Sequence, residues 1–274
     1  MIPRQFKLIQ LVALFILLTG VSSIGLATNL CVGHFEIDAA TARLIMNSYN
    51  TSRGLSHYVE RLTPTGSSFR NTLLDLPKDS IWLDSGTGLA RALIEGLKSF
   101  PNISQGIGIS YQRPDNFIYP TELGNRFSYL DGDLIENMAK SGQLNHLMGK
   151  VNLITDLYGA LSYTKEFAEV LQVLVDLLAQ DGKIFFHMTR TKNSVIATHE
   201  PGSSLLNWLE SIPGLEVTSL THPNKSKFDN RSNFETILIR KVSQEVKVPR
   251  DLFLKTYEDD APPKRRMLWD RKGS

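Results

Sequence analysis

A short turn between an apolar run and a helical pattern carries the residues whose types and spacing suggest chemistry. Residues 81–90 read IWLDSGTGLA, so the acid Asp84 ends the run and Gly86 and Gly88 follow it. Glycines at such a turn let the backbone approach a ligand where a Cβ atom would collide. The helix after the turn directs free N–H groups and its positive dipole end into the same space. The turn therefore predicts a site for a nucleotide-type ligand.

Two classes of ligand compete for this turn. A dinucleotide fingerprint needs a third glycine three residues after Gly88, and an acid near the end of the second strand. Position 91 is arginine instead, and the second strand, GIGIS, has Gly108 where the acid would stand. Both differences disfavour an NAD-linked oxidoreductase, which we keep as the least favoured alternative.

The elements that must position the turn alternate regularly from residue 80 onward. Segments such as VNLIT and KIFFHM are nearly continuous apolar runs, as expected for strands buried on both faces of a parallel sheet. The pattern predicts a doubly wound α/β domain whose last two strands form an antiparallel pair. The expected strands are 80–84, 104–109, 126–130, 151–155, 183–188, 214–220 and 233–240, and the expected helices are 88–99, 133–146, 163–179 and 203–211.

Four segments together resemble one enzyme family. LDSGTGLARAL resembles motif I of the class I S-adenosylmethionine-dependent methyltransferases, and YLDGDLIE resembles their Gly-Asp segment after the third strand. LITDLYGALSY is similar to their fourth-strand motif, and LLAQDGKIFFH to their glycine turn before the fifth strand. The resemblance covers residues 80–240 and implies a mostly parallel, seven-stranded, Rossmann-like methyltransferase sheet with an antiparallel last strand. It also implies transfer of a methyl group from S-adenosylmethionine to an unidentified small molecule or protein.

The resemblance assigns cofactor contacts residue by residue. Asp84 would organise the turn and approach the ammonium or methionine end of the cofactor, and Asp133 would accept a hydrogen bond from the adenine amino group. Ile109 and Leu134 would form apolar walls around the base, and Asp156 would lie where methyl donor and acceptor meet. For Asp84 and Asp133, capping of a turn or helix remains an alternative. The full predicted cofactor set is Asp84, Ser85, Gly86, Thr87, Gly88, Ile109, Asp133, Leu134 and Asp156.

Methyl transfer from a sulfonium needs little acid–base chemistry, although oxygen and nitrogen acceptors can need a base. The catalytic candidates are Asp156, Tyr158 and His187, which are expected at carboxyl ends of strands or in the loops that follow. A purely structural role is the alternative for His187. In this family the elements before the first strand commonly cover the active site, so the resemblance also directs attention to Tyr58, Arg61 and Arg70.

One feature of the family is missing. The second strand usually ends on an acid that binds the two ribose hydroxyls, and Gly108 occupies that place. Asp115, Glu122 or Ser110 could take over part of this role. The departure leaves a second hypothesis from another class, a catalytically degenerate methyltransferase-like domain that serves as a binding or scaffold module.

Both ends of the chain differ from the body. Residues 8–35 contain no charged side chain, and Arg4 and Lys7 precede them, so residues 1–27 read as a signal peptide or an uncleaved signal anchor. Residues 28–79 are expected to form an N-terminal helical cap, with a helix over 36–62. Residues 241–274 are expected to form a basic, partly disordered tail.

Composition excludes several classes of function. The 30 Lys and Arg nearly balance 28 Asp and Glu, and residues 8–239 are mildly acidic with 18 basic and 22 acidic side chains, so a nucleic-acid partner is not expected. One cysteine, Cys31, allows no internal disulfide and no four-thiolate zinc site, and we expect no metal.

The N-terminal segment predicts export or membrane association, which conflicts with the cytosolic location of S-adenosylmethionine.

Overall fold

The computed structural model describes most of the chain between residues 52 and 250. The described residues are 30–32, 35–37, 52–63, 68–164, 166–189, 196–197, 205–220, 234–250, 252–257 and 266–271. The chain divides into two units, residues 1–49 and 50–274. No helix in these described ranges is long and apolar enough to cross a bilayer, and the predicted segment 1–27 lies outside them.

The first unit contains a two-stranded antiparallel hairpin. Strand β1 (Leu30–Val32) pairs with β2 (Phe35–Ile37), and Leu30 lies opposite Ile37. The helix predicted over 36–62 is therefore wrong at its start, because Glu36 and Ile37 are in a strand. The described helices that precede the large sheet both belong to the second unit, namely α3 (Leu55–Leu62) and α4 (Ser68–Asp75).

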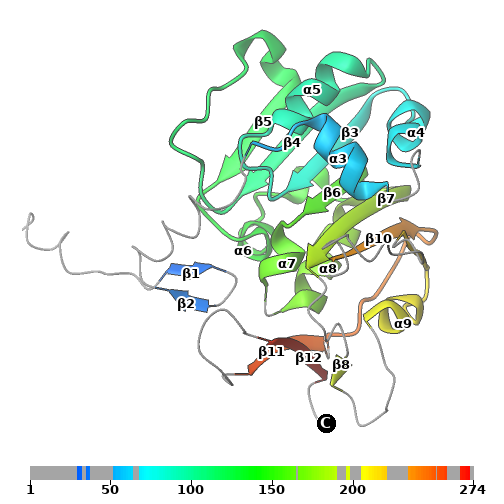
Figure 1. The fold of residues 1–274 in the computed structure, drawn as a ribbon. Helices are drawn as coiled ribbons and strands as arrows, with labels where there is room; N and C mark the ends of the chain where they lie inside the picture. The colour runs from blue at the N-terminus through cyan, green and yellow to red at the C-terminus, as the bar shows by residue number, and fades with distance from the viewer. Residues whose placement is uncertain are drawn as a thin grey trace, which may run out of the picture. The chain divides into compact units, whose positions relative to one another are not determined.

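The second unit is built on a seven-stranded sheet with the order β5-β4-β3-β6-β7-β10-β9 (Figure 1). All neighbouring pairs are parallel except the two that β10 makes, with β7 and with β9. This topology confirms the predicted doubly wound, mostly parallel, Rossmann-like sheet with an antiparallel last strand. The strands are β3 (Ser80–Ser85), β4 (Ile103–Ser110), β5 (Phe127–Asp131), β6 (Val151–Leu157), β7 (Leu178–Thr189), β9 (Leu215–Ser219) and β10 (Phe234–Lys241).

Side chains that alternate along the strands supply a hydrophobic core on each face of the sheet. On one face Trp82 and Phe185 pack with residues of α3, α4 and α5 (Arg91–Ser99). On the other face Leu83 and Phe186 pack with α6 (Ile135–Lys140), α7 (Ala160–Tyr163), α8 (Phe167–Leu177) and α9 (Leu205–Glu210). The two cores explain why the central strands carry apolar residues at nearly every position.

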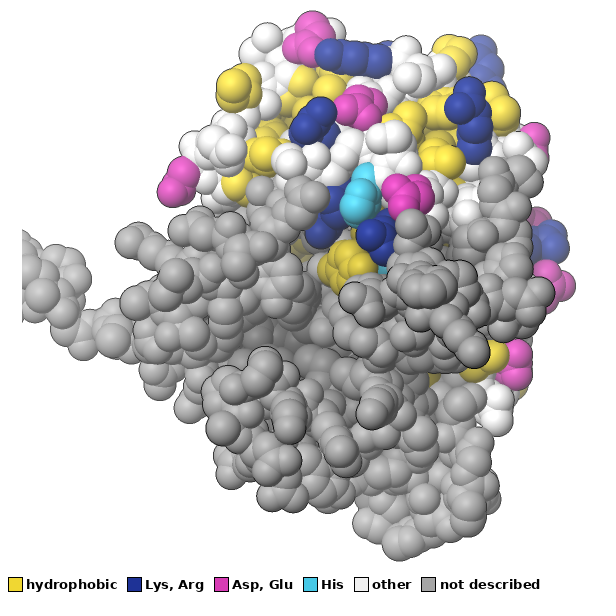
Figure 2. Space-filling view, viewed as in Figure 1, with side chains coloured by type: hydrophobic (Ala, Val, Ile, Leu, Met, Phe, Trp, Pro, Cys, Tyr) yellow, Lys and Arg dark blue, Asp and Glu magenta, His cyan; other side chains and the backbone are white. Residues whose placement is uncertain are grey.

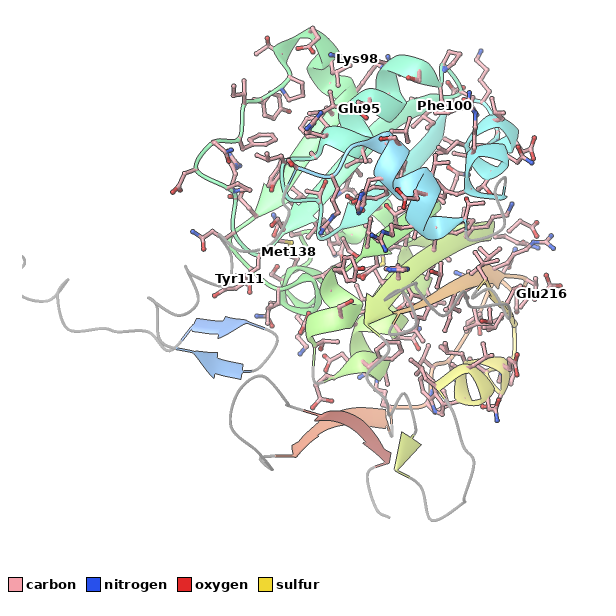
Figure 3. The ribbon with its side chains drawn as sticks, in the orientation of Figure 1. Glu95, Lys98, Phe100, Tyr111, Met138 and Glu216 are labelled. Carbon is pink, nitrogen blue, oxygen red and sulfur yellow. The ribbon has the colours of Figure 1, made fainter. Side chains whose placement is uncertain are left out.

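Helix α5 lies unusually close to the sheet. A Cβ atom at Gly96 would stand 2.3 Å from a ring carbon of Trp82, so glycine is needed for this contact. Glu95 on the same helix accepts the Leu55 N–H at 2.6 Å (Figure 3). This bond ties the start of α3 to α5.

Two short 3-10 helices and a small second sheet complete the described elements. The 3-10 helices are η1 (Thr121–Arg126), which precedes β5, and η2 (Asn145–Leu147), which precedes β6. The second sheet has the order β11-β12-β8 and contains β8 (Ile196–Ala197), β11 (Leu252–Tyr257) and β12 (Arg266–Arg271).

The residues after β10 begin as part of the packed fold. Lys241 is buried, and its ammonium donates to the carbonyls of Val175 and Leu178 at 3.0 Å each, at the end of α8. Val246 and Val248 are buried in the core. The predicted boundary between domain and tail at residue 241 thus falls inside a packed segment.

Candidate active site

The glycine turn after β3 is fixed to the neighbouring strand β4. The N–H groups of Gly86 and Thr87 both donate to the carbonyl of Ile109, at 2.8 and 3.1 Å. Gly86 and Gly88 have φ values of +106° and +53°, which favour glycine. The predicted turn is therefore formed, and it ends at the start of α5.

A second turn, between β6 and α7, closes directly onto the first. A Cβ atom at Gly86 would stand 2.4 Å from the Cα of Gly159, and one at Gly159 would stand 1.5 Å from the carbonyl oxygen of Ser85. We predicted that a ligand would require the glycine at position 86. In the structure the backbone of Gly159 makes a close approach at this position, which also favours glycine.

Asp84 lies fully buried beneath α3 and anchors it. Its Oδ2 accepts the Tyr58 hydroxyl at 2.7 Å, and its Oδ1 accepts the Thr155 hydroxyl at 2.6 Å. The indole N–H of Trp82 donates to Thr155 Oγ1 at 2.9 Å. Burial raises the pKa of Asp84, while the Thr155 and Tyr58 hydrogen bonds and the charge of Arg53 oppose that rise. Asp84 thus joins α3, β3 and β6 through hydrogen bonds.

Asp156 lies at the end of β6, and its carboxylate connects the two turns through hydrogen bonds. Its carboxylate accepts the Ser85 hydroxyl at 2.6 Å, the Gly159 N–H at 2.9 Å and the Leu161 N–H at 3.0 Å. The side chain is fully buried, and burial, together with the charge of Asp84, raises its pKa to about 6. The structure therefore shows Asp156 holding the backbone of the second turn.

The raised pKa of Asp156 predicts a pH dependence of stability. The folded state binds this proton more tightly than the unfolded state, so the free energy of unfolding should fall as pH rises from about 4 to 7. Asp156→Asn should lose this contribution, roughly 2–3 kcal/mol across that range. Urea unfolding of both proteins at several pH values measures the difference, and parallel pH profiles would contradict the expectation.

Tyr158 and His187 form a hydrogen-bonded pair next to these turns. His187 Nε2 lies 3.0 Å from the Tyr158 hydroxyl, and His187 Nδ1 lies 2.6 Å from Thr236 Oγ1. Thr236 Oγ1 in turn donates to the carbonyl of Arg61 at 3.2 Å. With the threonine proton directed to the Arg61 carbonyl, the consistent tautomer has His187 Nδ1 donating to Thr236 and Nε2 accepting from Tyr158.

The surroundings of the pair lower the pKa of His187, and the backbone of Tyr158 has an unusual conformation. Burial, followed by the charges of Arg61, His57 and Arg53, lowers the pKa of His187 to about 3, so the ring is neutral at physiological pH. Tyr158 has a φ of +56°, in a region that non-glycine residues rarely adopt. Strained backbone conformations of this kind cluster at functional sites. The two catalytic candidates Tyr158 and His187 are thus in contact.

Three cationic or titratable side chains of the α3 segment face the pair. Arg53 precedes α3, whereas His57 and Arg61 are four residues apart within it and therefore lie on one side of the helix. The Arg53 guanidinium donates to the Gly86 carbonyl at 3.2 Å, and it lies over the Tyr158 ring at 5.7 Å. Figure 2 shows Lys, Arg and His side chains gathered in the middle of this face.

The predicted adenine contacts lie at the neighbouring strand ends. Asp133 is exposed, and its Oδ1 accepts the Leu134 N–H at 2.8 Å and the Asn137 amide at 2.7 Å. Asp133 therefore precedes the N-cap residue Leu134 of α6 and does not itself cap the helix, and its Oδ2 is the oxygen that can meet a base. Leu134 is half-buried, whereas Ile109 is only 3% exposed and belongs to the core.

Thr87 fills the space that the missing ribose acid would use. A Cβ atom at Gly108 would stand 2.7 Å from Thr87 Cγ2 and 3.1 Å from Thr87 Oγ1. The Thr87 hydroxyl is near enough to lower the pKa of Asp84, yet it is buried without a hydrogen bond of regular geometry in the described part of the chain. A bound hydroxyl group would satisfy it.

Of the three residues that we considered as substitutes for the ribose acid, two bind other groups and one is exposed. Ser110 donates to the Gln112 carbonyl at 2.9 Å, and Glu122 pairs with Lys98 at 2.7 Å. Asp115 is exposed. A different acid, Asp131, ends β5 opposite Ser110 and pairs with Arg113 at 2.7 Å.

Sequence reasoning missed four residues of this site. Arg53 and His57 could have been found from their four-residue spacing with Arg61. The partners Thr155 and Thr236 carry no such signal, because an isolated threonine in a strand is ordinary. Of the covering residues that the resemblance pointed to, Tyr58 and Arg61 join the site, whereas Arg70 is exposed on α4.

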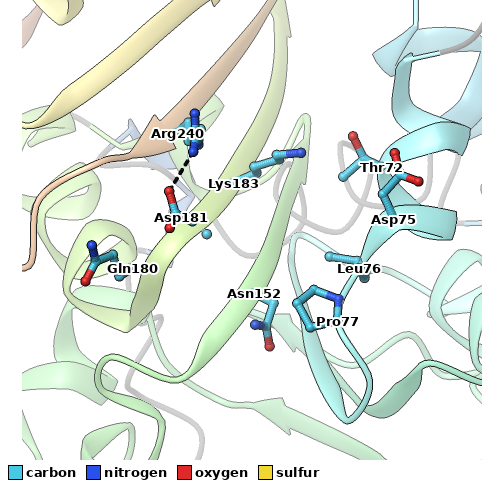
Figure 4. Close-up of a pocket in the computed structure, with 10 residues that line it drawn as sticks. Thr72, Asp75, Leu76, Pro77, Asn152, Gln180, Asp181, Lys183 and Arg240 are labelled. Atoms are coloured by element: carbon cyan, nitrogen blue, oxygen red, sulfur yellow. Dashed lines mark hydrogen bonds and ion pairs between the residues drawn. The ribbon is translucent and has the colours of Figure 1, made fainter.

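A groove of about 340 Å³ lies at the opposite edge of the sheet (Figure 4). It contains none of the predicted site residues. Arg240 in its wall pairs with Asp181 at 2.7 Å and with Glu216 at 3.1 Å. The lining residues are Thr72, Asp75, Leu76, Pro77, Asn152, Gln180, Asp181, Gly182, Lys183 and Arg240.

Comparisons with known proteins were made by sequence and by structure. No protein-family model matches the sequence, and no curated protein is similar to it in sequence. In structure the chain is similar to the CurJ carbon methyltransferase, with 15% identity, 76% of this chain and 62% of that chain covered, and a TM-score of 0.49.

Two further solved structures are similar to a comparable degree. One is the Burkholderia thailandensis 1,6-didemethyltoxoflavin-N1-methyltransferase with bound S-adenosylhomocysteine, with 12% identity, 74% and 84% of the two chains covered, and a TM-score of 0.46. The other is the antibiotic-resistance methyltransferase Kmr, with 16% identity, 63% and 92% of the two chains covered, and a TM-score of 0.40.

Proposed function

We propose that the chain is an S-adenosylmethionine-dependent methyltransferase. The observation that carries this proposal is a convergence at one sheet edge of the glycine turn after β3, Asp133 after β5, Tyr158 after β6 and His187 near the end of β7. Ligands of open α/β sheets bind outside the carboxyl ends of the strands. The family resemblance of the four sequence segments adds independent support.

Residues at this edge would contact the adenine, the ribose and the carboxylate of the cofactor. Asp133 Oδ2 would accept the adenine amino group, and Leu134 would pack against the base. Thr87 Oγ1 would satisfy its hydrogen bonding on a ribose hydroxyl, in place of the acid that Gly108 lacks. Arg53, next to the Gly86 carbonyl, would bind the cofactor's carboxylate through a charge-assisted hydrogen bond.

Catalysis would then depend mainly on the position of the methyl acceptor. S-adenosylmethionine supplies an already activated methyl group, so catalysis consists largely of holding an acceptor in line with it. Tyr158 and His187 stand beside the turn and would orient the acceptor. Asp84 and Asp156, each bonded to at least two donors, would keep α3 and the two turns in place.

Replacing Asp133 tests the adenine assignment. We expect Asp133→Ala to weaken S-adenosylmethionine binding by about 1–3 kcal/mol, because it removes the acceptor for the adenine amino group. Equilibrium dialysis measures the affinity. Asn137→Ala is the matched control, since it removes the amide that donates to Asp133 but leaves the carboxylate; equal losses in the two variants would indicate a structural effect and contradict the assignment.

A catalytically degenerate binding module is the second candidate. It is favoured by the direct contact of Gly86 with Gly159 and by the Tyr58 hydroxyl on Asp84, which together occupy part of the turn. Such a module would bind S-adenosylmethionine without turnover, or would not bind it. Single-turnover transfer of a labelled methyl group by the intact chain separates the two candidates.

We also propose that the protein is exported or membrane-associated through residues 1–27. The support is the uncharged stretch behind Arg4 and Lys7. Fractionation of cells that express the intact chain, with protease added on each side of the membrane, tests this. Recovery of the full-length chain in the soluble cytosol would contradict it.

A further inference from the structure

The groove at the edge of the sheet where β6 and β7 begin lies apart from the proposed active site. Its lining comes from α4 and the two residues after it, from the starts of β6 and β7, and from the end of β10 (Figure 4). Its volume of about 340 Å³ falls in the range of small-molecule sites, roughly 300–1,000 Å³. A ligand bound there would be independent of the proposed methyltransferase function, because that cofactor belongs at the opposite edge.

The charge of Arg240 in this groove is already balanced. Its guanidinium pairs with Asp181 at 2.7 Å and with Glu216 at 3.1 Å. Two carboxylates more than offset the single positive charge, so this cluster forms part of the wall and has no positive charge to offer a ligand. The other charged side chains in the lining are Lys183 and Asp75.

Lys183 and Asp75 line the groove from different elements and carry opposite charges. Lys183 on β7 is half-buried, and its ammonium points toward the side of the groove that α4 forms, where Asp75 lies (Figure 4). Within the described part of the chain, neither side chain forms an ion pair, with the other or with a third residue. A half-buried ammonium is partly removed from water, so an anionic partner would stabilise it.

Asn152 adds a neutral donor to the lining. Its Oδ1 accepts the Ile81 N–H at 3.0 Å, which fixes the orientation of the amide and turns its NH2 group away from that bond. Among the described residues this NH2 group has no hydrogen-bond acceptor. Asn152 and Lys183 come from the neighbouring strands β6 and β7. Together they offer donors for a carboxylate on one side of the groove, while Asp75 offers an acceptor on the other.

We propose that this groove binds a small zwitterion of the amino-carboxylate class. The ligand carboxylate accepts hydrogen bonds from Lys183 and Asn152, and the ligand ammonium donates to Asp75. A simple carboxylate would place a second negative charge near Asp75, and a simple amine would place a second positive charge near Lys183. A molecule with opposite charges at its two ends is complementary to both sides at once.

Saturation-transfer NMR, which observes the ligand, tests binding to the intact chain. The probes are glycine, β-alanine and γ-aminobutyrate, whose two charges are separated by increasing lengths of chain. Butyrate and butylamine are the singly charged controls. We expect at least one zwitterion to bind at least about tenfold more tightly than either control. Equal affinity for butyrate or butylamine, or no binding of any zwitterion, would overturn the proposal.

Variants locate the probe in the groove. Lys183→Gln should weaken binding of the tightest zwitterion at least about tenfold and remove its advantage over butylamine. Asp75→Asn should cause a similar loss and remove the advantage over butyrate. Lys78→Gln and Asp79→Asn are matched controls, because they make the same charge changes at exposed residues outside the lining. Unchanged binding in the two groove variants, or equal losses in the controls, would show that the probe binds elsewhere and would contradict the proposal.

The affinity for S-adenosylmethionine separates this site from the proposed active site. Lys183→Gln should leave that affinity unchanged, since Lys183 lies at the opposite edge of the sheet. A loss in this variant would place the amino-carboxylate end of the cofactor in the groove and would contradict a separate site. Failure of the unaltered chain to bind S-adenosylmethionine would refute only the proposed function, because the zwitterion probes are measured without the cofactor.

Discussion

Gly159→Ala is expected to destabilise the second unit by at least about 4 kcal/mol, which is exceptional for a single methyl group. The new Cβ atom would lie 1.5 Å from the carbonyl oxygen of Ser85 and 2.9 Å from Asp156 Oδ2. Neither neighbour can move freely, because Ser85 ends a central strand and Asp156 holds the second turn. Relief of the clash would require the two turns to separate.

Chemical unfolding followed by tryptophan fluorescence measures this loss. The matched control is Gly149→Ala, at a position with a φ of +69° and no atom within 4 Å of the added Cβ. There the cost should be only the backbone strain, about 1 kcal/mol. If the two variants lose similar amounts of stability, the two turns do not touch in solution as described.

Asp84→Ala is expected to destabilise the protein by about 3–5 kcal/mol, because it leaves the buried hydroxyls of Tyr58 and Thr155 without their acceptor. Affinity for S-adenosylmethionine should also fall, since α3 and the glycine turn lose their connection. Urea unfolding and equilibrium dialysis measure the two effects. Loss of affinity without loss of stability would mean that Asp84 contacts the cofactor and does not anchor α3.

A double-mutant cycle isolates the bond between Tyr58 and Asp84. Tyr58→Phe alone should cost about 1–3 kcal/mol, because it leaves one oxygen of a buried carboxylate unpaired. In the Asp84→Ala background the same change should cost at least about 1 kcal/mol less, since the hydroxyl no longer has a partner to lose. Additive losses would show that the two side chains are not coupled.

The sheet could be predicted from the sequence because its strands carry strong local signals. The expected strands 80–84 and 233–240 correspond closely to β3 (Ser80–Ser85) and β10 (Phe234–Lys241). The mostly parallel, doubly wound sheet with an antiparallel last strand followed from the apolar pattern and the family resemblance, and the structure confirms it.

Helix boundaries were predicted less well, for identifiable reasons. The helix expected from 88 begins at Arg91, because Gly88 and Ala90 have positive φ values. The helix expected over 133–146 ends at Lys140, and Gly142 follows with a φ of +79°. The helix expected over 163–179 corresponds to α8 (Phe167–Leu177), and the separate short helix α7 (Ala160–Tyr163) precedes it. Left-handed residues end helices without changing the apolar pattern, so the pattern alone overextends them.

The site was predicted as a list of residues but not as a set of contacts. Asp84, Asp156, Tyr158 and His187 do gather at one edge. Their partners come from distant segments, as when Tyr58 on α3 donates to Asp84 and Thr236 on β10 contacts His187. Such long-range bonds depend on tertiary packing, which local sequence signals do not encode.

Titration of the intact chain with S-adenosylmethionine in a calorimeter tests the central claim most directly. The account predicts saturable binding below millimolar concentration, competition by S-adenosylhomocysteine, and no saturable binding of NAD. Folded protein that shows no heat of binding with S-adenosylmethionine at millimolar concentration would contradict the account, as would binding of NAD in its place.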